Sequence, residues 1–231
     1  MGKAAERRQQ LRNALVRTAE RTVRRKGLAA LKARELAAEV GCALGAIYNV
    51  FPDLDALILV VNSRTLAAFQ RYLARLDSRE GAAQRPGDHP AVARLMRLAT
   101  AYFDFAVANQ PRWRALFEHR MGGIGKVPSW YIEAQKPLFA LLEEPLSKLR
   151  PELGQEQKVL LARNVFAAIH GIVDLGLNQK LAATPAPILR AQVGQIAAAI
   201  GAGLLAEAPA TASLAGSDPA LSHRRSAGRM S

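Results

Sequence analysis

Residues Ala33–Pro52, with the sequence ARELAAEVGCALGAIYNVFP, decide the fold of this chain. The spacing of the apolar residues predicts two short helices, the second from about Ala43 to Phe51, joined by a tight turn. The small Ala37 lets the two helices cross closely, and Gly41 tolerates the left-handed backbone that ends the first helix. Ile47, six residues after this glycine, anchors the second helix in the core. This pattern predicts a helix-turn-helix unit.

Positive charge is concentrated just before this unit. The chain has 231 residues with 32 Lys and Arg against 19 Asp and Glu, which gives a net charge of +13. Residues 1–26 alone carry nine basic and two acidic side chains, a net charge of +7. A basic helix beside a helix-turn-helix favours a polyanion partner, namely nucleic acid. The alternative is a basic helix face that only contacts solvent.

The segment GCALGAIYNVFPDLDAL, residues 41–57, resembles the motif that closes the DNA-binding domain of TetR-family transcriptional regulators. The shared spacing is Gly, three residues, Gly, two residues, Tyr, two residues, Phe, and then a new helix. The resemblance is specific over residues 10–60 and looser beyond. It implies an all-α protein of about nine helices. Residues 1–52 would form a three-helix DNA-binding domain, residues 53–206 a helical bundle for ligand binding and dimerisation, and residues 207–231 a disordered tail.

Periodicity and breaker residues predict where these helices lie. Pro137 and Pro145 fall inside one of them, so we expect that helix to be bent or broken. Residues 78–90 and 122–128 are expected to be loops, and the Ala/Pro/Ser/Gly-rich end to be disordered. The expected helices span residues 6–26, 33–40, 43–51, 53–77, 91–108, 111–121, 129–149, 156–181 and 188–206.

The second helix of the unit would enter the major groove of double-stranded DNA. Asn49 could read adenine through paired hydrogen bonds. Tyr48 corresponds to the family tyrosine whose hydroxyl meets phosphate, the alternative being a packing residue. The residues expected to face DNA are Lys32, Arg34, Ala43, Leu44, Gly45, Ala46, Tyr48 and Asn49. A palindromic operator follows from the resemblance if the protein is a homodimer.

Two departures from the family pattern bear on this interface. Family members commonly carry Lys at the positions of Leu44 and Leu54, where it neutralises phosphate. Lys32 and Ala43 stand where Ser or Thr usually caps a helix. Two alternatives therefore stay open beside sequence-specific binding. One is a helical dimer that binds DNA without sequence preference, and the other is a ligand-binding protein with a degenerate head.

The last two helices are rich in small and apolar residues, which favours close packing against a second copy of the chain. Burial of these faces within one chain is the alternative. The residues expected at a dimer interface are Gly194, Ala197, Ala198, Gly201 and Ala202.

The segment FAAIHGIVDLGLN, residues 166–178, resembles the eighth helix of TetR relatives that carry a Trp…His-Gly signature, with Phe166 in place of Trp. The resemblance implies a repressor that a small, largely apolar inducer releases from its operator. Aromatic residues at helical spacing are also ordinary core residues, and His170 could be a hydrogen-bonded core histidine. The residues expected to contact the ligand are Phe105, Trp113, Phe117, His119, Trp130, Tyr131, Phe166 and His170.

Other function classes find no support in the sequence. Cys42 is the only cysteine, so no intrachain disulfide can form. The four histidines lack metal-ligand spacing, and no catalytic constellation, glycine-rich phosphate loop or cofactor motif is present. We therefore expect neither an enzyme nor a cofactor or metal. We found no uninterrupted apolar run of about 18 residues and no signal peptide, and we expect a cytoplasmic protein without a membrane partner.

Overall fold

The computed structural model describes residues 2–79, 89–119, 127–180 and 183–207. Every regular element within these ranges is a helix, which confirms the all-α prediction. Most of the loop expected at residues 78–90 lies outside the described residues, namely residues 80–88. The same is true of residues 122–126 in the loop expected at residues 122–128. The predicted tail lies outside the described residues apart from residue 207.

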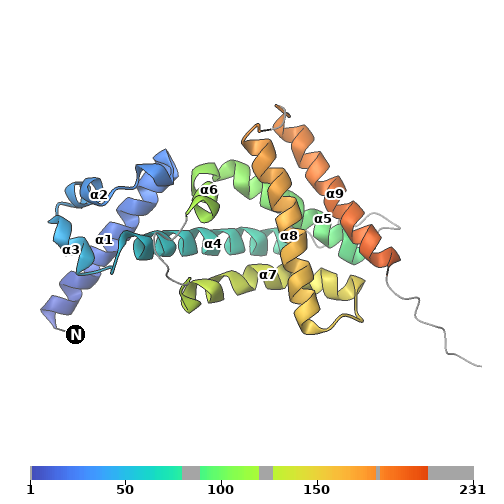
Figure 1. Cartoon of the computed structure of the whole chain (residues 1–231), viewed down its shortest axis with the longest axis horizontal. Helices are drawn as coiled ribbons and strands as arrows, with labels where there is room; N and C mark the ends of the chain where they lie inside the picture. Colours follow the sequence, from blue (N-terminus) through green and yellow to red (C-terminus); the bar gives the residue numbers. More distant parts are fainter. Residues whose placement is uncertain (1, 80–88, 120–126, 181–182, 208–231) are drawn as a thin grey trace, which may run out of the picture.

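The helices follow the predicted order (Figure 1). The third is shorter than predicted and ends at Tyr48, because Asn49 and Val50 form a turn. The described elements are α1 (Lys3–Lys26), the 3-10 turn η1 (Leu28–Ala30), α2 (Ala33–Val40), α3 (Leu44–Tyr48), α4 (Leu54–Arg79), α5 (Pro90–Ala108), α6 (Gln110–Glu118), α7 (Ser129–Leu149), α8 (Gln155–Leu177) and α9 (Ala186–Ala206).

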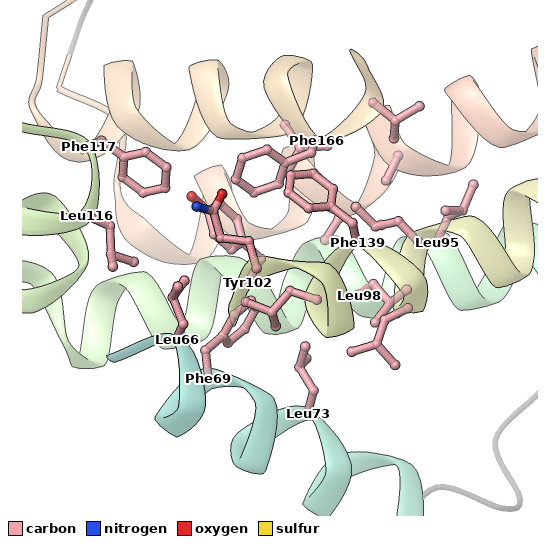
Figure 2. A pocket seen from close by; sticks show the side chains of 18 of the residues that line it. Leu66, Phe69, Leu73, Leu95, Leu98, Tyr102, Leu116, Phe117, Phe139 and Phe166 are labelled. Atoms are coloured by element: carbon pink, nitrogen blue, oxygen red, sulfur yellow. The ribbon is translucent and has the colours of Figure 1, made fainter. Parts of the chain in front are cut away.

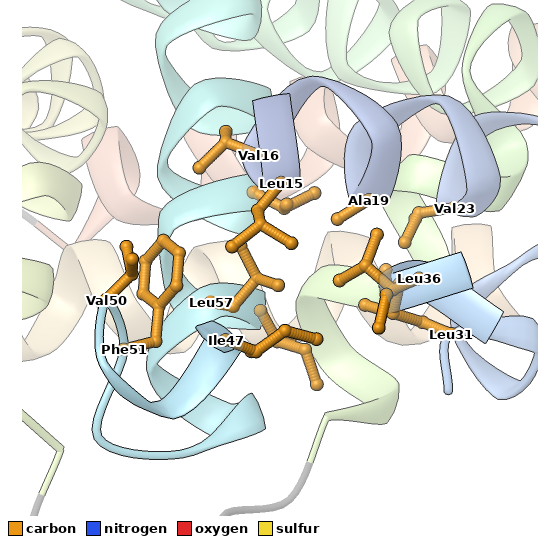
Figure 3. Packing of buried hydrophobic residues seen from close by; sticks show 14 residues of the cluster. Leu15, Val16, Ala19, Val23, Leu31, Leu36, Ile47, Val50, Phe51 and Leu57 are labelled. Atoms are coloured by element: carbon orange, nitrogen blue, oxygen red, sulfur yellow. The ribbon is translucent and has the colours of Figure 1, made fainter. Parts of the chain in front are cut away.

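Helices α1–α3 form a head around the first turns of α4, at one end of the long axis in Figure 1. Its core closes around Ile47, which is fully buried among side chains from α1, α2 and α4 (Figure 3). Ala115 of α6 belongs to the same core. The small Ala37 is buried there too, as the helix-turn-helix pattern predicted.

The turn between α2 and α3 has the predicted backbone. Gly41 adopts φ 76° and ψ 38°, in the left-handed region that favours glycine. The Cys42 amide donates to the Ala37 carbonyl over 3.0 Å, which satisfies one of the free carbonyls at the end of α2. The starts of α2 and α3 have no side-chain cap, as predicted. Asp53 caps α4 as predicted, since its Oδ1 accepts from the Ala56 amide over 2.6 Å.

The body consists of α5–α9 with the distal part of α4. Helix α7 runs without a break through Pro137 and Pro145, so of the two predicted outcomes, bent or broken, the structure excludes the break. Each proline removes one hydrogen bond from the helix. Packing of α7 against α4, α5 and α8 offsets this cost.

Helix α9 packs along α5 through small residues. A Cβ at Gly194 would lie 3.0 Å from Thr100 Cγ2, and one at Gly201 would lie 3.2 Å from Val92 Cγ2. Ala197 is buried between them. These three residues therefore pack within the chain, which corrects their assignment to a dimer interface. Of the other two, Ala198 is half-buried and Ala202 is exposed.

Helices α8 and α9 are long and apolar enough, by length and composition alone, to cross a membrane. This finding concerns mean hydropathy and not the uninterrupted apolar run on which the expectation rested. It is weak evidence for a membrane, because helices of soluble proteins pass the same test. Only 22% of the apolar window in α8 and 28% of that in α9 is buried within the chain, so much of both surfaces lacks cover.

Candidate nucleic-acid interface and apolar pocket

The residues predicted to face DNA lie on the outer surface of the head. Tyr48 is 49% exposed and Leu44 37%. A Cβ at Gly45 would meet nothing within 4 Å, so packing within the chain does not require glycine there. Lys32, Arg34, Ala43 and Asn49 are also exposed, and Ala46 is half-buried. The structure thus brings these eight positions to the surface formed by α3 and the start of α2.

Two contacts fix this surface on α1. The Arg12 guanidinium lies 4.4 Å from the centroid of the Phe51 ring, a cation–π contact just beyond α3. Arg21 on α1 forms a 2.7 Å ion pair with Glu39 on α2. The basic first helix therefore positions the turn unit besides contributing charge.

The body contains an apolar cavity of about 230 Å³ that is partly open to solvent (Figure 2). Side chains from six helices meet in its wall. The lining residues are Leu66, Phe69 and Leu73 of α4, Leu95, Leu98, Ala99 and Tyr102 of α5, Leu116 and Phe117 of α6, Tyr131, Gln135, Leu138, Phe139, Leu141 and Leu142 of α7, Val165, Phe166 and Ile169 of α8, and Ala197 of α9. None of these described lining residues carries a formal charge.

Three of the eight predicted ligand contacts line the cavity, namely Phe117, Tyr131 and Phe166. Trp113 and His170 stand one layer behind it, within hydrogen-bond distance of Tyr102. The remaining three lie elsewhere. Phe105 packs against Phe69 and Tyr72, Trp130 is 44% exposed, and His119 Nε2 lies 3.6 Å from Asp55 Oδ1.

Tyr102 is the centre of a hydrogen-bonded triad in the cavity wall. The Trp113 indole Nε1 donates to the Tyr102 oxygen over 2.8 Å, and that hydroxyl lies 2.8 Å from His170 Nδ1. An indole N–H can only donate, so the Tyr102 oxygen accepts there. Its own proton points to Nδ1 when His170 is neutral and carries its proton on Nε2.

Burial acts on both titratable members of this triad. It raises the pKa of the Tyr102 hydroxyl well above its ordinary value, although the Trp113 hydrogen bond opposes the shift. Burial lowers the pKa of His170, while the nearby Asp174 carboxylate opposes that change. Both effects keep the triad uncharged at neutral pH.

Helix α6 joins the cavity to the head. Leu116 and Phe117 line the cavity, whereas the preceding Ala115 is fully buried in the head core. The buried Asn62 of α4 donates from Nδ2 to the Ala115 carbonyl over 3.1 Å. A ligand in the cavity and the core of the head therefore contact the same turn of α6, residues 115–117.

Comparison with known proteins agrees with this architecture. Residues 95–196 match the family model for the tetracyclin repressor-like C-terminal domain. This segment contains most of the cavity wall. The body of the chain therefore contains a TetR-like C-terminal domain.

Solved structures show the same fold over most of the chain. A TetR transcriptional regulator from Rhodococcus sp. RHA1 is 13% identical, with a TM-score of 0.54 over 84% of this chain and 96% of that one. A protein of unknown function from the same organism is 23% identical, with a TM-score of 0.61 over 82% and 94%. RolR, solved with resorcinol, is 16% identical, with a TM-score of 0.58 over 88% and 96%. No curated protein sequence matches the chain.

The TetR resemblance missed most of the cavity wall. Tyr102 and Gln135 were not among the predicted contacts, nor were Leu66, Phe69 and Leu73 of α4. The α4 residues follow an apolar stripe in the sequence, which marks a buried face without distinguishing a core from a cavity. Gln135 had no such signal, because Glu133 and Lys136 stand beside it and place it in a polar stretch of α7.

Proposed function

We propose that this protein is a sequence-specific DNA-binding regulator of the TetR family, a repressor that a small, largely apolar ligand releases from its operator. The observation that carries the proposal is the shared helix α6, which contributes Phe117 to the cavity and Ala115 to the head core. In this proposal residues 1–52 bind DNA and residues 53–206 bind the ligand and a second copy. The protein would act in the cytoplasm.

Recognition of DNA would use the exposed face of α3. Asn49 offers an amide for paired hydrogen bonds to adenine, and Arg34 is placed to meet phosphate at the start of α2. The open space at Gly45 would let the backbone approach the duplex. Tyr48, which is half exposed, would place its hydroxyl on phosphate.

Release would follow from unequal affinity of the ligand for two arrangements of the body. A ligand shifts this equilibrium only if it binds the DNA-incompetent arrangement more tightly. A molecule in the cavity presses on Leu116 and Phe117, and any displacement of α6 reaches the head through Ala115. The resorcinol complex of RolR supports a small aromatic molecule in this fold.

A homodimer would cover the outer faces of α8 and α9. Large apolar side chains are exposed there, and the family model spans α8 and the first half of α9. We therefore assign this surface to a second copy rather than to lipid. The exposed residues are Leu160 (58%), Leu175 (37%), Ile188 (52%), Ile196 (37%) and Leu205 (39%).

Sedimentation tests the dimer. Ile196→Arg would bury a charge in the proposed interface and is expected to yield monomers. Ile132→Arg is the matched control, because Ile132 is 46% exposed on α7, outside this face. An Ile196→Arg protein that still sediments as a dimer would place the interface elsewhere.

A second candidate function is DNA binding without sequence preference. The exposed Leu44 supports it, because this family position commonly carries a phosphate-binding lysine. Such binding would depend on phosphate charge alone and would weaken steeply as salt rises.

Selection of bound duplexes from a random library, at roughly physiological salt, separates the two functions. Enrichment of a two-fold-symmetric site is the result expected for the regulator. Arg34→Ala should then bind that site more weakly without changing the unfolding transition. Binding without enrichment that disappears as salt rises would establish the second candidate instead.

A further inference from the structure

The cavity wall carries few polar groups, and their hydrogen-bond directions determine what a ligand must offer. Apart from Tyr102 and Tyr131, the polar lining side chain is Gln135 of α7. Its Nε2 donates to the Tyr131 carbonyl over 3.3 Å. A carbonyl can only accept, so this contact fixes the orientation of the amide, uses one of its two N–H groups and leaves Oε1 as its acceptor end.

The two tyrosines have their hydroxyls engaged elsewhere. Tyr102 accepts from Trp113, and with His170 protonated on Nε2 its own proton goes to His170 Nδ1 rather than to a ligand. The Tyr131 oxygen accepts from the side chain of Asn62, on the side toward the head. The cavity therefore presents an acceptor at Gln135 within walls that are otherwise aliphatic and aromatic.

Charge is excluded by the same walls. Neither a cationic nor an anionic side chain is among the described residues that line the cavity. An ionised carboxylate or ammonium would lose its hydration there without gaining a counter-ion, which is strongly unfavourable. A neutral ligand avoids this desolvation penalty.

The volume limits the ligand size. An apolar cavity of about 150 Å³ in another protein stays dry and binds benzene. The cavity of about 230 Å³ here has room for a second ring. Faces and edges of Phe69, Phe117, Phe139 and Phe166 are available to pack against such rings.

We propose that the pocket binds a neutral, naphthalene-sized apolar compound that carries a hydrogen-bond donor, which Gln135 Oε1 accepts. This inference rests on the proposed function, since it names the chemical class of the releasing ligand. The inference predicts that the pocket binds hydroxylated compounds more tightly than the matching methyl ethers or carboxylates.

Calorimetric titration of the full chain with three matched probes tests the inference. The probes are 2-naphthol, 2-methoxynaphthalene, which has no donor, and 2-naphthoate, which is charged. We expect 2-naphthol to bind about tenfold more tightly than the ether, the effect of one net hydrogen bond. We expect 2-naphthoate to bind at least about 100-fold more weakly than 2-naphthol, because its charge would be buried unpaired.

Gln135→Leu supplies the matched variant, because it replaces the amide with an apolar side chain of similar size on the same helix. The preference for 2-naphthol over the ether should fall to about one, with the affinity for the ether retained. Gln10→Leu on the exposed face of α1 is the control and should keep the tenfold preference. Retained ether binding also shows that the Gln135→Leu pocket is folded.

Several results would overturn the inference: equal affinity for 2-naphthol and the ether, tight binding of 2-naphthoate, an unchanged preference in Gln135→Leu, or no binding of any probe. The proposed function fails separately. If 2-naphthol binds as expected but leaves the affinity for the selected DNA site unchanged, release by this ligand class is wrong while the pocket chemistry stands.

Discussion

Trp113 and Tyr102 are joined by a buried hydrogen bond of 2.8 Å from the indole Nε1 to the phenolic oxygen. The bond links α6, which reaches into the head core, to α5 in the wall of the cavity. Because Tyr102 also bonds His170 of α8, one hydroxyl connects three helices. Tyr102 therefore joins three helices of the body and also lines the pocket.

Tyr102→Phe should destabilise the protein by about 1–3 kcal/mol, because it leaves the Trp113 N–H and His170 Nδ1 without their shared partner. Urea denaturation measures the change in the free energy of unfolding. Tyr48→Phe is the control, since its hydroxyl is on the exposed face of α3 and its loss should change stability by less than about 0.5 kcal/mol. Equal stability of Tyr102→Phe and the parent protein would show that the triad contributes nothing.

The same triad predicts a dependence of stability on pH. Burial lowers the pKa of His170 in the folded state below its ordinary value of 6.5, with Asp174 opposing the shift. The unfolded chain therefore binds a proton at higher pH than the folded chain does. The contribution of His170 to stability is fully present above about pH 6.5 and declines as the pH falls from there toward the lowered folded value.

His170→Asn isolates this contribution, because its amide oxygen can accept the Tyr102 proton and does not titrate. Unfolding free energies measured from pH 7.5 down to pH 5 should fall less steeply in the variant. Parallel curves for the two proteins would mean that His170 titrates alike in the folded and unfolded chains.

Gly176→Ala should destabilise the contact between α8 and α9. A Cβ at this position would lie 2.3 Å from Leu189 Cδ2, and Leu189 is itself buried. The overlap forces a buried side chain to move, which costs about 1–3 kcal/mol. Gly45→Ala is the control, because its Cβ would meet nothing within 4 Å and alanine favours a helix. A Gly176→Ala protein as stable as the control would show that Leu189 repacks without cost.

The helix order and the turn at Gly41 could be predicted because they depend on local signals, namely periodicity, a left-handed glycine and the Asp53 cap. The packing partner of α9 could not. Gly194 and Gly201 permit close approach by any helix, and nothing local to them says that α5 of the same chain is the neighbour. The pocket was predicted in part for the same reason. Phe117 lines it and Phe105 does not, although both are aromatic residues on apolar helix faces.

Leu44→Lys should strengthen DNA binding. Leu44 is 37% exposed at the first position of α3, where TetR relatives commonly carry a lysine, so the new ammonium can reach phosphate without displacing a core side chain. One added phosphate contact should steepen the dependence of log K on log salt by about 0.9.

Titrations of the selected site and of an unrelated duplex at several salt concentrations measure this slope. Because a phosphate contact carries no sequence information, affinity should rise for both duplexes. Ile132→Lys, on the exposed face of α7 outside both the DNA-facing surface and the proposed dimer interface, supplies the charge-matched control and should leave the slope unchanged. A Leu44→Lys protein with the parent slope would show that the start of α3 does not approach the DNA backbone.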